Sequence, residues 1–65
     1  MSIRCLIVDD EPLARKLLIS YVESCQDLTL VAACATAMEA RTKLREENID
    51  LVFLDIPVSY THLRA

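Results

Sequence analysis

Three aspartates stand where acidic side chains could do chemistry. Asp9 and Asp10 directly follow the largely apolar run of residues 3–8, and Asp55 directly follows the apolar run of residues 51–54. If the two runs form neighbouring strands, these carboxylates converge and repel one another unless a cation screens them. Mg²⁺ suits such a place, because it prefers oxygen ligands and commonly bridges protein carboxylates to a phosphate. Asp55 is the best-placed nucleophile, since a carboxylate beside a metal can form an acyl phosphate.

A simpler interpretation of the same aspartates stays open at this point. Asp9 and Asp10 could cap the helix that follows them, and Asp55 could be an ordinary loop acid. Acidic residues often follow strands, so composition alone gives the two interpretations comparable weight.

Three strands are predicted to carry these aspartates. Residues 3–8 form a short run that is rich in branched side chains and ends abruptly in acids, and residues 51–54 end in the same way. Residues 28–34 contain Leu, Val and Ala in near-continuous sequence. Such runs are typical of parallel strands that are covered on both faces.

A first helix is predicted to begin near Pro12, whose missing N–H costs nothing in a first turn. Asp10 or Glu11 can serve the free N–H groups there. Apolar residues recur at spacings of three, four and five along this segment and predict one face laid on a sheet. They are Leu13, Leu17, Leu18, Tyr21, Val22 and Cys25.

A second helix is predicted over about residues 37–47. Thr36 and Glu39 form a capping box, in which each side chain accepts from the free backbone N–H of the other residue. The inward side of this helix is predicted to carry Met38, Ala40 and Leu44, and its charged residues form a solvated face. Strands alternating with helices predict an α/β fold with a parallel sheet and right-handed crossovers. Ligands of such sheets bind beyond the carboxyl ends of the strands, where the three aspartates fall.

Composition narrows the classes of function. The 65 residues carry a formal charge of −3, which argues against a nucleic-acid-binding surface on this segment. The longest apolar-rich run, residues 28–38, is shorter than the roughly 20 residues of a membrane helix, and no signal peptide is found. We therefore expect a cytoplasmic protein, in which the three cysteines are reduced and packed in the core. They are Cys5, Cys25 and Cys34.

Two motifs resemble signatures of the response-regulator receiver family: IRCLIVDDEP at residues 3–12 and LVFLDI at residues 51–56. The resemblance covers residues 2 to about 56, the N-terminal half of a receiver. It implies a flavodoxin-like, doubly wound parallel sheet, truncated to strand, helix, strand, helix and strand. It also implies that Asp10 binds Mg²⁺ directly and Asp9 mainly through water. Asp55 would be the phosphoacceptor, taking its phosphoryl group from the phosphohistidine of a sensor histidine kinase.

The resemblance also predicts the setting of the domain. The segment EPLAR at residues 11–15 is similar to the LytTR-type subgroup, whose members usually carry a C-terminal DNA-binding domain. The full-length parent would then be a transcriptional regulator that reaches DNA only through that missing domain. It would make no membrane contact and could form a homodimer.

The family pattern stops at Pro57, where the chain reads DIPVSY and has no glycine. The receiver half is therefore expected over residues 1–57, and residues 58–65 are expected to be an unrelated tail in which His62 has no function. The resemblance assigns a third Mg²⁺ ligand to the backbone carbonyl of Pro57, although the fixed φ of proline constrains the loop there.

Two rival hypotheses remain beside a non-enzymatic signalling module. A haloacid-dehalogenase-type phosphatase also uses an aspartate nucleophile and Mg²⁺, but Asp9, Asp10 and Glu11 lack its Asp-x-Asp spacing and Asp55 would have no role. An inactive fragment is the other, because a half-sheet leaves strand edges and apolar helix faces exposed.

Overall fold

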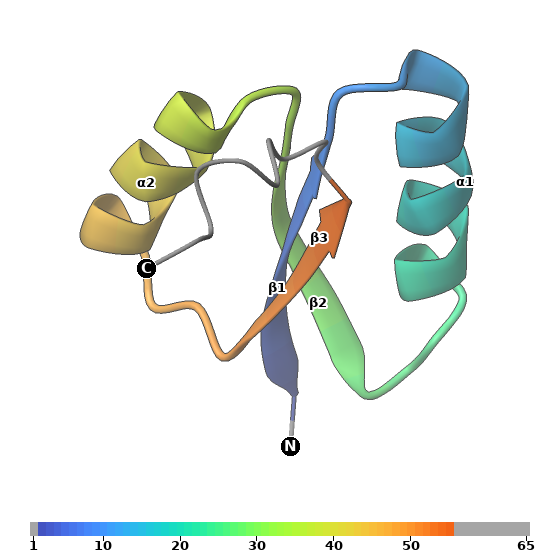
Figure 1. The fold of residues 1–65 in the computed structure, drawn as a ribbon. Coiled ribbons are helices and arrows are strands. Elements are labelled where there is room, and N and C mark those ends of the chain that lie inside the picture. The colour runs from blue at the N-terminus through green and yellow to red at the C-terminus, as the bar shows by residue number, and fades with distance from the viewer. Residues whose placement is uncertain (1, 56–65) are drawn as a thin grey trace, which may run out of the picture.

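The computed structural model describes residues 2–55 as a three-stranded parallel sheet between two helices (Figure 1). In chain order the elements are β1 (Ile3–Asp9), α1 (Pro12–Glu23), β2 (Leu28–Cys34), α2 (Ala37–Glu46) and β3 (Leu51–Asp55). The strand order is β2-β1-β3, so β1 is central and pairs in parallel with both neighbours. The predicted α/β class and order of elements are confirmed. The tail predicted at residues 58–65, with His62, lies outside the described residues.

The two cores lie on opposite faces of the sheet. Successive side chains of a strand alternate between faces, so β1 supplies both cores. The core on the α1 side contains Cys5, Ile7 and Val22. The core on the α2 side contains Leu6, Val8, Cys34 and Ala40. Residues 5–9 of β1 are therefore covered on both faces, as its apolar sequence predicted, whereas Ile3 is exposed at the start of the strand.

α1 packs on the sheet through a different stripe than predicted. Val22 is buried, and Leu18 and Ile19 pack beside it. Leu13, Leu17 and Tyr21 were predicted to face the sheet, but they are 76%, 57% and 61% exposed. The apolar residues of this helix span two adjacent stripes, and only the stripe closer to the sheet is covered by the described residues.

The capping box of α2 forms with one change from the prediction. The Oγ1 atom of Thr36 accepts a hydrogen bond of 3.2 Å from the backbone N–H of Glu39, as predicted. The Glu39 carboxylate accepts from the backbone N–H of Ala35 at 3.1 Å, one residue earlier than predicted. Of the three residues predicted to face inward only Ala40 is buried, whereas Met38 and Leu44 are exposed. α2 therefore contacts the sheet through Ala40, and the described residues leave the two larger side chains uncovered.

The cysteines are free, and two of the three lie in the cores. Cys5 and Cys34 are buried, whereas Cys25 is exposed. The prediction that Cys25 packs in the core is wrong, because α1 ends at Glu23 and Cys25 follows its C-cap residue, Ser24.

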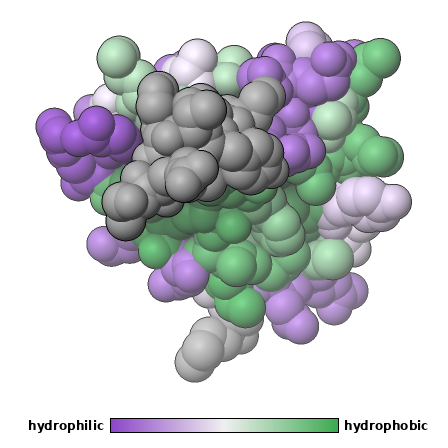
Figure 2. Space-filling view, viewed as in Figure 1, coloured by the Kyte–Doolittle hydropathy of each residue, from purple (hydrophilic) through white to green (hydrophobic). Residues whose placement is uncertain are grey.

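β3 is an edge strand with little cover. Leu51, Val52 and Leu54 are 39%, 36% and 68% exposed. Figure 2 shows apolar side chains gathered on the face of the molecule where β3 lies in Figure 1.

Within residues 2–55, no helix is long and apolar enough to cross a membrane.

Candidate functional site

Asp9 and Asp55 end two neighbouring strands. In the parallel pairing of β1 with β3, Asp9 is the register partner of Asp55. Register partners in a parallel pair present their side chains on the same face of the sheet. Alternation places both residues on the α1 side, because Ile7 and Phe53, two positions earlier in each strand, belong to the core beneath α1. The condition set in the sequence analysis, that the first and third strands are neighbours, is met.

The register that brings these two aspartates together is fixed at the opposite end of the strands. The backbone N–H of Arg4 donates to Oδ2 of Asp50 at 3.0 Å, and the backbone N–H of Asp50 donates to the Arg4 carbonyl at 2.8 Å. The Arg4 guanidinium also donates to the Asn48 carbonyl at 2.7 Å and pairs with the Glu47 carboxylate at 3.1 Å. This reciprocal tether starts β3 opposite Cys5, so that four residues later Asp55 falls opposite Asp9.

Asp9 is the most unusual acid of the described residues. It is 1% exposed. Its Oδ1 atom accepts a hydrogen bond of 2.9 Å from the backbone N–H of Glu11. Its Oδ2 atom is buried and has no hydrogen-bond partner among the described residues. An unpartnered buried oxygen costs about 1–3 kcal/mol, and more when the group is charged, so this atom calls for a cation or a donor from outside the described residues.

The hydrogen bond of Asp9 shows how far helix capping explains the acids after β1. The first turn of α1 has no side-chain cap from its N-cap residue, Glu11, and the prediction that Asp10 or Glu11 serves the free N–H groups there is wrong. Asp9 stabilises the turn before the helix with one oxygen only. Because helix capping leaves Oδ2 unexplained, it does not account for Asp9 as a whole.

Asp10 and Asp55 differ from Asp9 in that both are exposed. Asp10 lies in the bend that follows β1, and Asp55 is the last residue of the edge strand. No group of three acidic, histidine or cysteine side chains within residues 2–55 is close enough to hold a metal ion. The structure thus brings the strand ends of Asp9 and Asp55 together but does not gather three carboxylates. Pro57, the predicted carbonyl ligand, lies outside the described residues.

The residues present still suit a hard cation. The donor set is made of carboxylate oxygens, which Mg²⁺ prefers, and Mg²⁺ commonly keeps several waters in place of protein ligands. The unpartnered Oδ2 of Asp9 is the observation that supports this fit.

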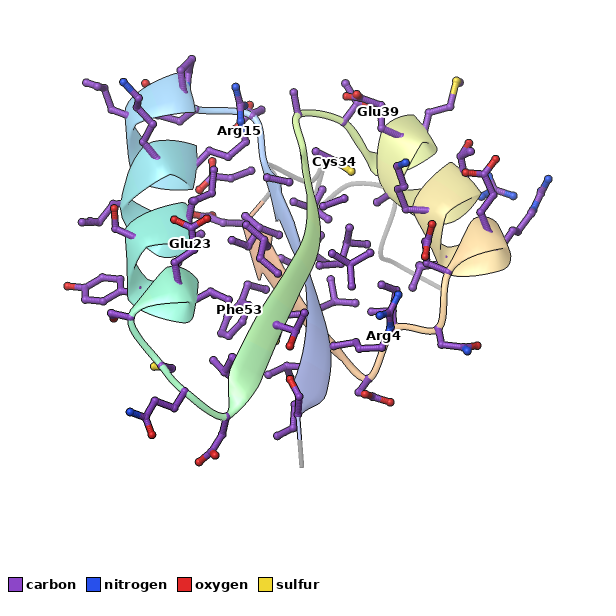
Figure 3. All side chains as sticks on the ribbon, turned by 180° about the vertical axis from the view of Figure 1, so that it is seen from behind. Arg4, Arg15, Glu23, Cys34, Glu39 and Phe53 are labelled. Carbon is purple, nitrogen blue, oxygen red and sulfur yellow. The ribbon has the colours of Figure 1, made fainter. Side chains whose placement is uncertain are left out.

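Arg15 is a site residue that the sequence analysis missed. Its Nη1 atom donates to the backbone carbonyl of Asp9 at 2.9 Å, from the first turn of α1 back to the end of β1. Figure 3 shows Arg15 at this end of the sheet, whereas Arg4 lies at the other. The available signal was an arginine within the sheet-facing stripe of α1, at spacings of three, four and seven from Leu18, Ile19 and Val22.

The buried cysteines do not compete with Asp55 as nucleophiles. Burial raises the pKa of the Cys5 thiol, and the nearby Asp50 carboxylate raises it further. Burial likewise raises the pKa of Cys34, with a further contribution from Glu39. Both thiols therefore stay protonated at neutral pH, and a protonated thiol is a poor nucleophile.

Comparison with known protein families gives one match. The family model of the response regulator receiver domain matches residues 5–60, which include Asp9, Asp10 and Asp55. The matched segment covers most of the chain.

Several curated proteins are similar to this chain. The transcriptional regulatory protein BtsR of Salmonella typhi is 44% identical over 54 residues, which are 83% of this chain and 23% of that protein. An uncharacterized response regulatory protein of Shewanella oneidensis is 43% identical over 54 residues, with the same coverage of 83% and 23%. The sensory transduction protein LytT of Enterococcus faecalis is 45% identical over 51 residues, 78% of this chain and 21% of that protein. The chain thus spans less than a quarter of each of these relatives. No solved structure gave a significant match.

Proposed function

Since the chain belongs to the response regulator receiver family, we propose that Asp55 is its phosphoacceptor and receives a phosphoryl group from the phosphohistidine of a partner kinase. The observation that carries this proposal is the register of β3 against β1, which sets Asp55 opposite a buried aspartate with an unpartnered oxygen. Receiver domains of this family are signalling modules, which leaves the phosphatase alternative without support.

We propose that Asp9, Asp10 and Asp55 hold Mg²⁺ at the carboxyl ends of β1 and β3, with the Pro57 carbonyl as a further ligand. When bound, Mg²⁺ would screen the negative charges of the carboxylates and of the incoming phosphoryl group. The buried Oδ2 of Asp9 supports this choice of cation, because a divalent ion would compensate the atom that lacks a partner. Asp10 and Asp55 are exposed and can turn toward an ion without disturbing the core.

The chemistry assigned to Asp55 is nucleophilic. A carboxylate oxygen of Asp55 forms a bond to phosphorus, while the bond between phosphorus and the histidine nitrogen of the donor breaks. The imidazole that leaves takes a proton from solvent. The exposed edge of β3 suits this transfer, because the donor side chain must reach Asp55 from another molecule.

The wider setting is also a proposal, since the chain covers only part of its relatives. We place the phosphoryl transfer in the cytoplasm, with a sensor histidine kinase as the partner. We propose that the full-length parent regulates transcription, as the name of BtsR says of that relative, that it reaches DNA through a further C-terminal domain, and that it forms a homodimer.

Mass spectrometry after treatment with acetyl phosphate and Mg²⁺ tests the acceptor. We expect one phosphoryl group on Asp55, removed by the substitution Asp55→Asn. Asp27→Asn is the matched control, because Asp27 is an exposed acid at the opposite end of the sheet, and this variant should still be labelled. Labelling at another residue, or undiminished labelling of Asp55→Asn, would reject the assignment.

A further inference from the structure

The backbone of Asp9 is held by a side chain from the following helix. The Nη1 atom of Arg15 donates to the Asp9 carbonyl at 2.9 Å across six residues of sequence. Arg15 is half-buried and lies within the stripe of α1 that faces the sheet, four residues before Ile19 and seven before Val22. A guanidinium in that stripe is unusual, because arginine side chains are mostly exposed on surface helices.

Asp9 therefore has two separate tethers. The Glu11 N–H fixes the carboxylate through Oδ1 at 2.9 Å, and Arg15 fixes the backbone through the carbonyl oxygen at 2.9 Å. Together they hold both the main chain and the side chain of Asp9, and Oδ2 is the one buried side-chain oxygen left without a partner among the described residues. The tethers thus define where that oxygen is presented.

The contact of Arg15 is with the carbonyl and not with a carboxylate. Within residues 2–55 the structure contains one ion pair, between Arg4 and Glu47, and it lies at the other end of β1. The carboxylate oxygen Oδ2 of Asp9 therefore remains available although a cationic side chain lies next to the residue. An arginine that neutralised Asp9 directly would have occupied that oxygen.

We propose that Arg15 is a positioning residue for the cation site, acting through the backbone of Asp9. This inference rests on the proposed function, because it requires that Asp9 helps to bind a divalent ion. Groups that orient metal ligands typically contribute about 10-fold to 100-fold to metal affinity. Arg15 lies in the first turn of α1, so this helix holds Asp9 in place through a hydrogen bond.

The charge of Arg15 gives this proposal a sharp test. A positive charge near a cation site weakens cation binding through repulsion, so removing the charge alone should strengthen binding slightly. Removing a positioning hydrogen bond should weaken it. The two effects have opposite signs, and Lys16, the exposed neighbour of Arg15 on α1, provides a matched removal of charge.

The experiment titrates the 65-residue chain with Mn²⁺ and measures free Mn²⁺ by electron paramagnetic resonance, with Mg²⁺ as the competitor. We expect Arg15→Gln to bind Mn²⁺ about 10-fold more weakly than the unsubstituted chain. Lys16→Gln should bind equally well or up to about twofold more tightly. Arg15→Lys, which keeps the charge and one donor, should recover part of the loss.

The Mn²⁺ affinities distinguish a failure of the Arg15 proposal from a failure of the cation site. If Arg15→Gln binds as tightly as the unsubstituted chain, or tightens as Lys16→Gln does, Arg15 has no positioning role. If the unsubstituted chain binds no Mn²⁺, the proposed cation site itself is wrong. Circular dichroism melts of all variants separate a general loss of folding, which would also affect the far-ultraviolet signal, from a local loss at Asp9.

Discussion

The substitution Asp9→Asn should stabilise the chain when no divalent cation is present. Asp9 is 1% exposed and its Oδ2 atom has no partner among the described residues, so one oxygen of a buried carboxylate is left unsatisfied. Asparagine keeps the carbonyl oxygen that accepts from the Glu11 N–H at 2.9 Å and removes the charge. The Nδ2 atom of asparagine is itself unpartnered where Oδ2 stood, so the substitution relieves only the extra cost of burying a charge. The free energy of unfolding should therefore rise by about 1 kcal/mol.

The expected change is large enough to measure by thermal unfolding. In a domain of this size, 1 kcal/mol shifts Tm by roughly 4–8 °C. Circular dichroism melts in buffer with a metal chelator should therefore show a higher Tm for Asp9→Asn. Asp27→Asn is the control, because Asp27 is an exposed acid at the opposite end of the sheet, where its carbonyl accepts from the Ile3 N–H. Its Tm should not change.

Addition of Mg²⁺ should reverse the order of stability. A ligand at 100 times its Kd adds about 2.7 kcal/mol to the free energy of unfolding. The unsubstituted chain should gain this stability, whereas Asp9→Asn should gain little because it has lost a ligand charge. A lower Tm of Asp9→Asn in chelator, or an equal rise in the Tm of both chains with Mg²⁺, would contradict a buried, unsatisfied Asp9 carboxylate that binds the ion.

Two further predictions concern the scaffold. Thr36→Ala should lower the free energy of unfolding by about 1 kcal/mol, because Oγ1 of Thr36 caps α2 at the Glu39 N–H. Urea titration measures this change, and an unchanged unfolding midpoint would contradict the role of the cap. Cys25 should react rapidly with a thiol reagent at neutral pH, whereas Cys5 and Cys34 should react only as the chain unfolds. Burial both shields these two thiols from the reagent and raises the pKa of each. Mass spectrometry follows the rate of modification of each cysteine, and equal rates for all three would argue against the described cores.

Local pattern was sufficient to predict the elements of this fold. The near-continuous apolar runs predicted three parallel strands, and Pro12 and the Thr36 cap predicted where the helices begin. The sequence predicted that Asp9 and Asp55 converge only if their strands are neighbours, and the strand order β2-β1-β3 meets that condition.

Which side of a helix faces the sheet could not be predicted in the same way. Leu13, Leu17 and Tyr21 form a stripe next to that of Leu18 and Val22, and hydrophobic periodicity cannot choose between adjacent stripes. Contacts between distant segments decide that choice.

The tethers of the site were likewise hidden in the sequence. The bonds of Arg4 with Asp50 span 46 residues, and the bond from Arg15 to Asp9 uses a backbone carbonyl that every residue possesses. The place of Arg15 within the sheet-facing stripe of α1 was a signal, but the acceptor of its hydrogen bond could not be predicted. The unpartnered oxygen of Asp9 could be found only once the neighbours of that atom were placed.

A Mg²⁺ titration of the isotope-labelled chain, followed by the shifts of backbone amide resonances, tests the shared cation site most directly. We expect saturable shifts at Asp9, Asp10, Glu11 and Asp55, and none at Asp27 or Asp50, which lie at the other end of the strands. Shifts confined to other acids, or no saturable shift at either strand end, would contradict it.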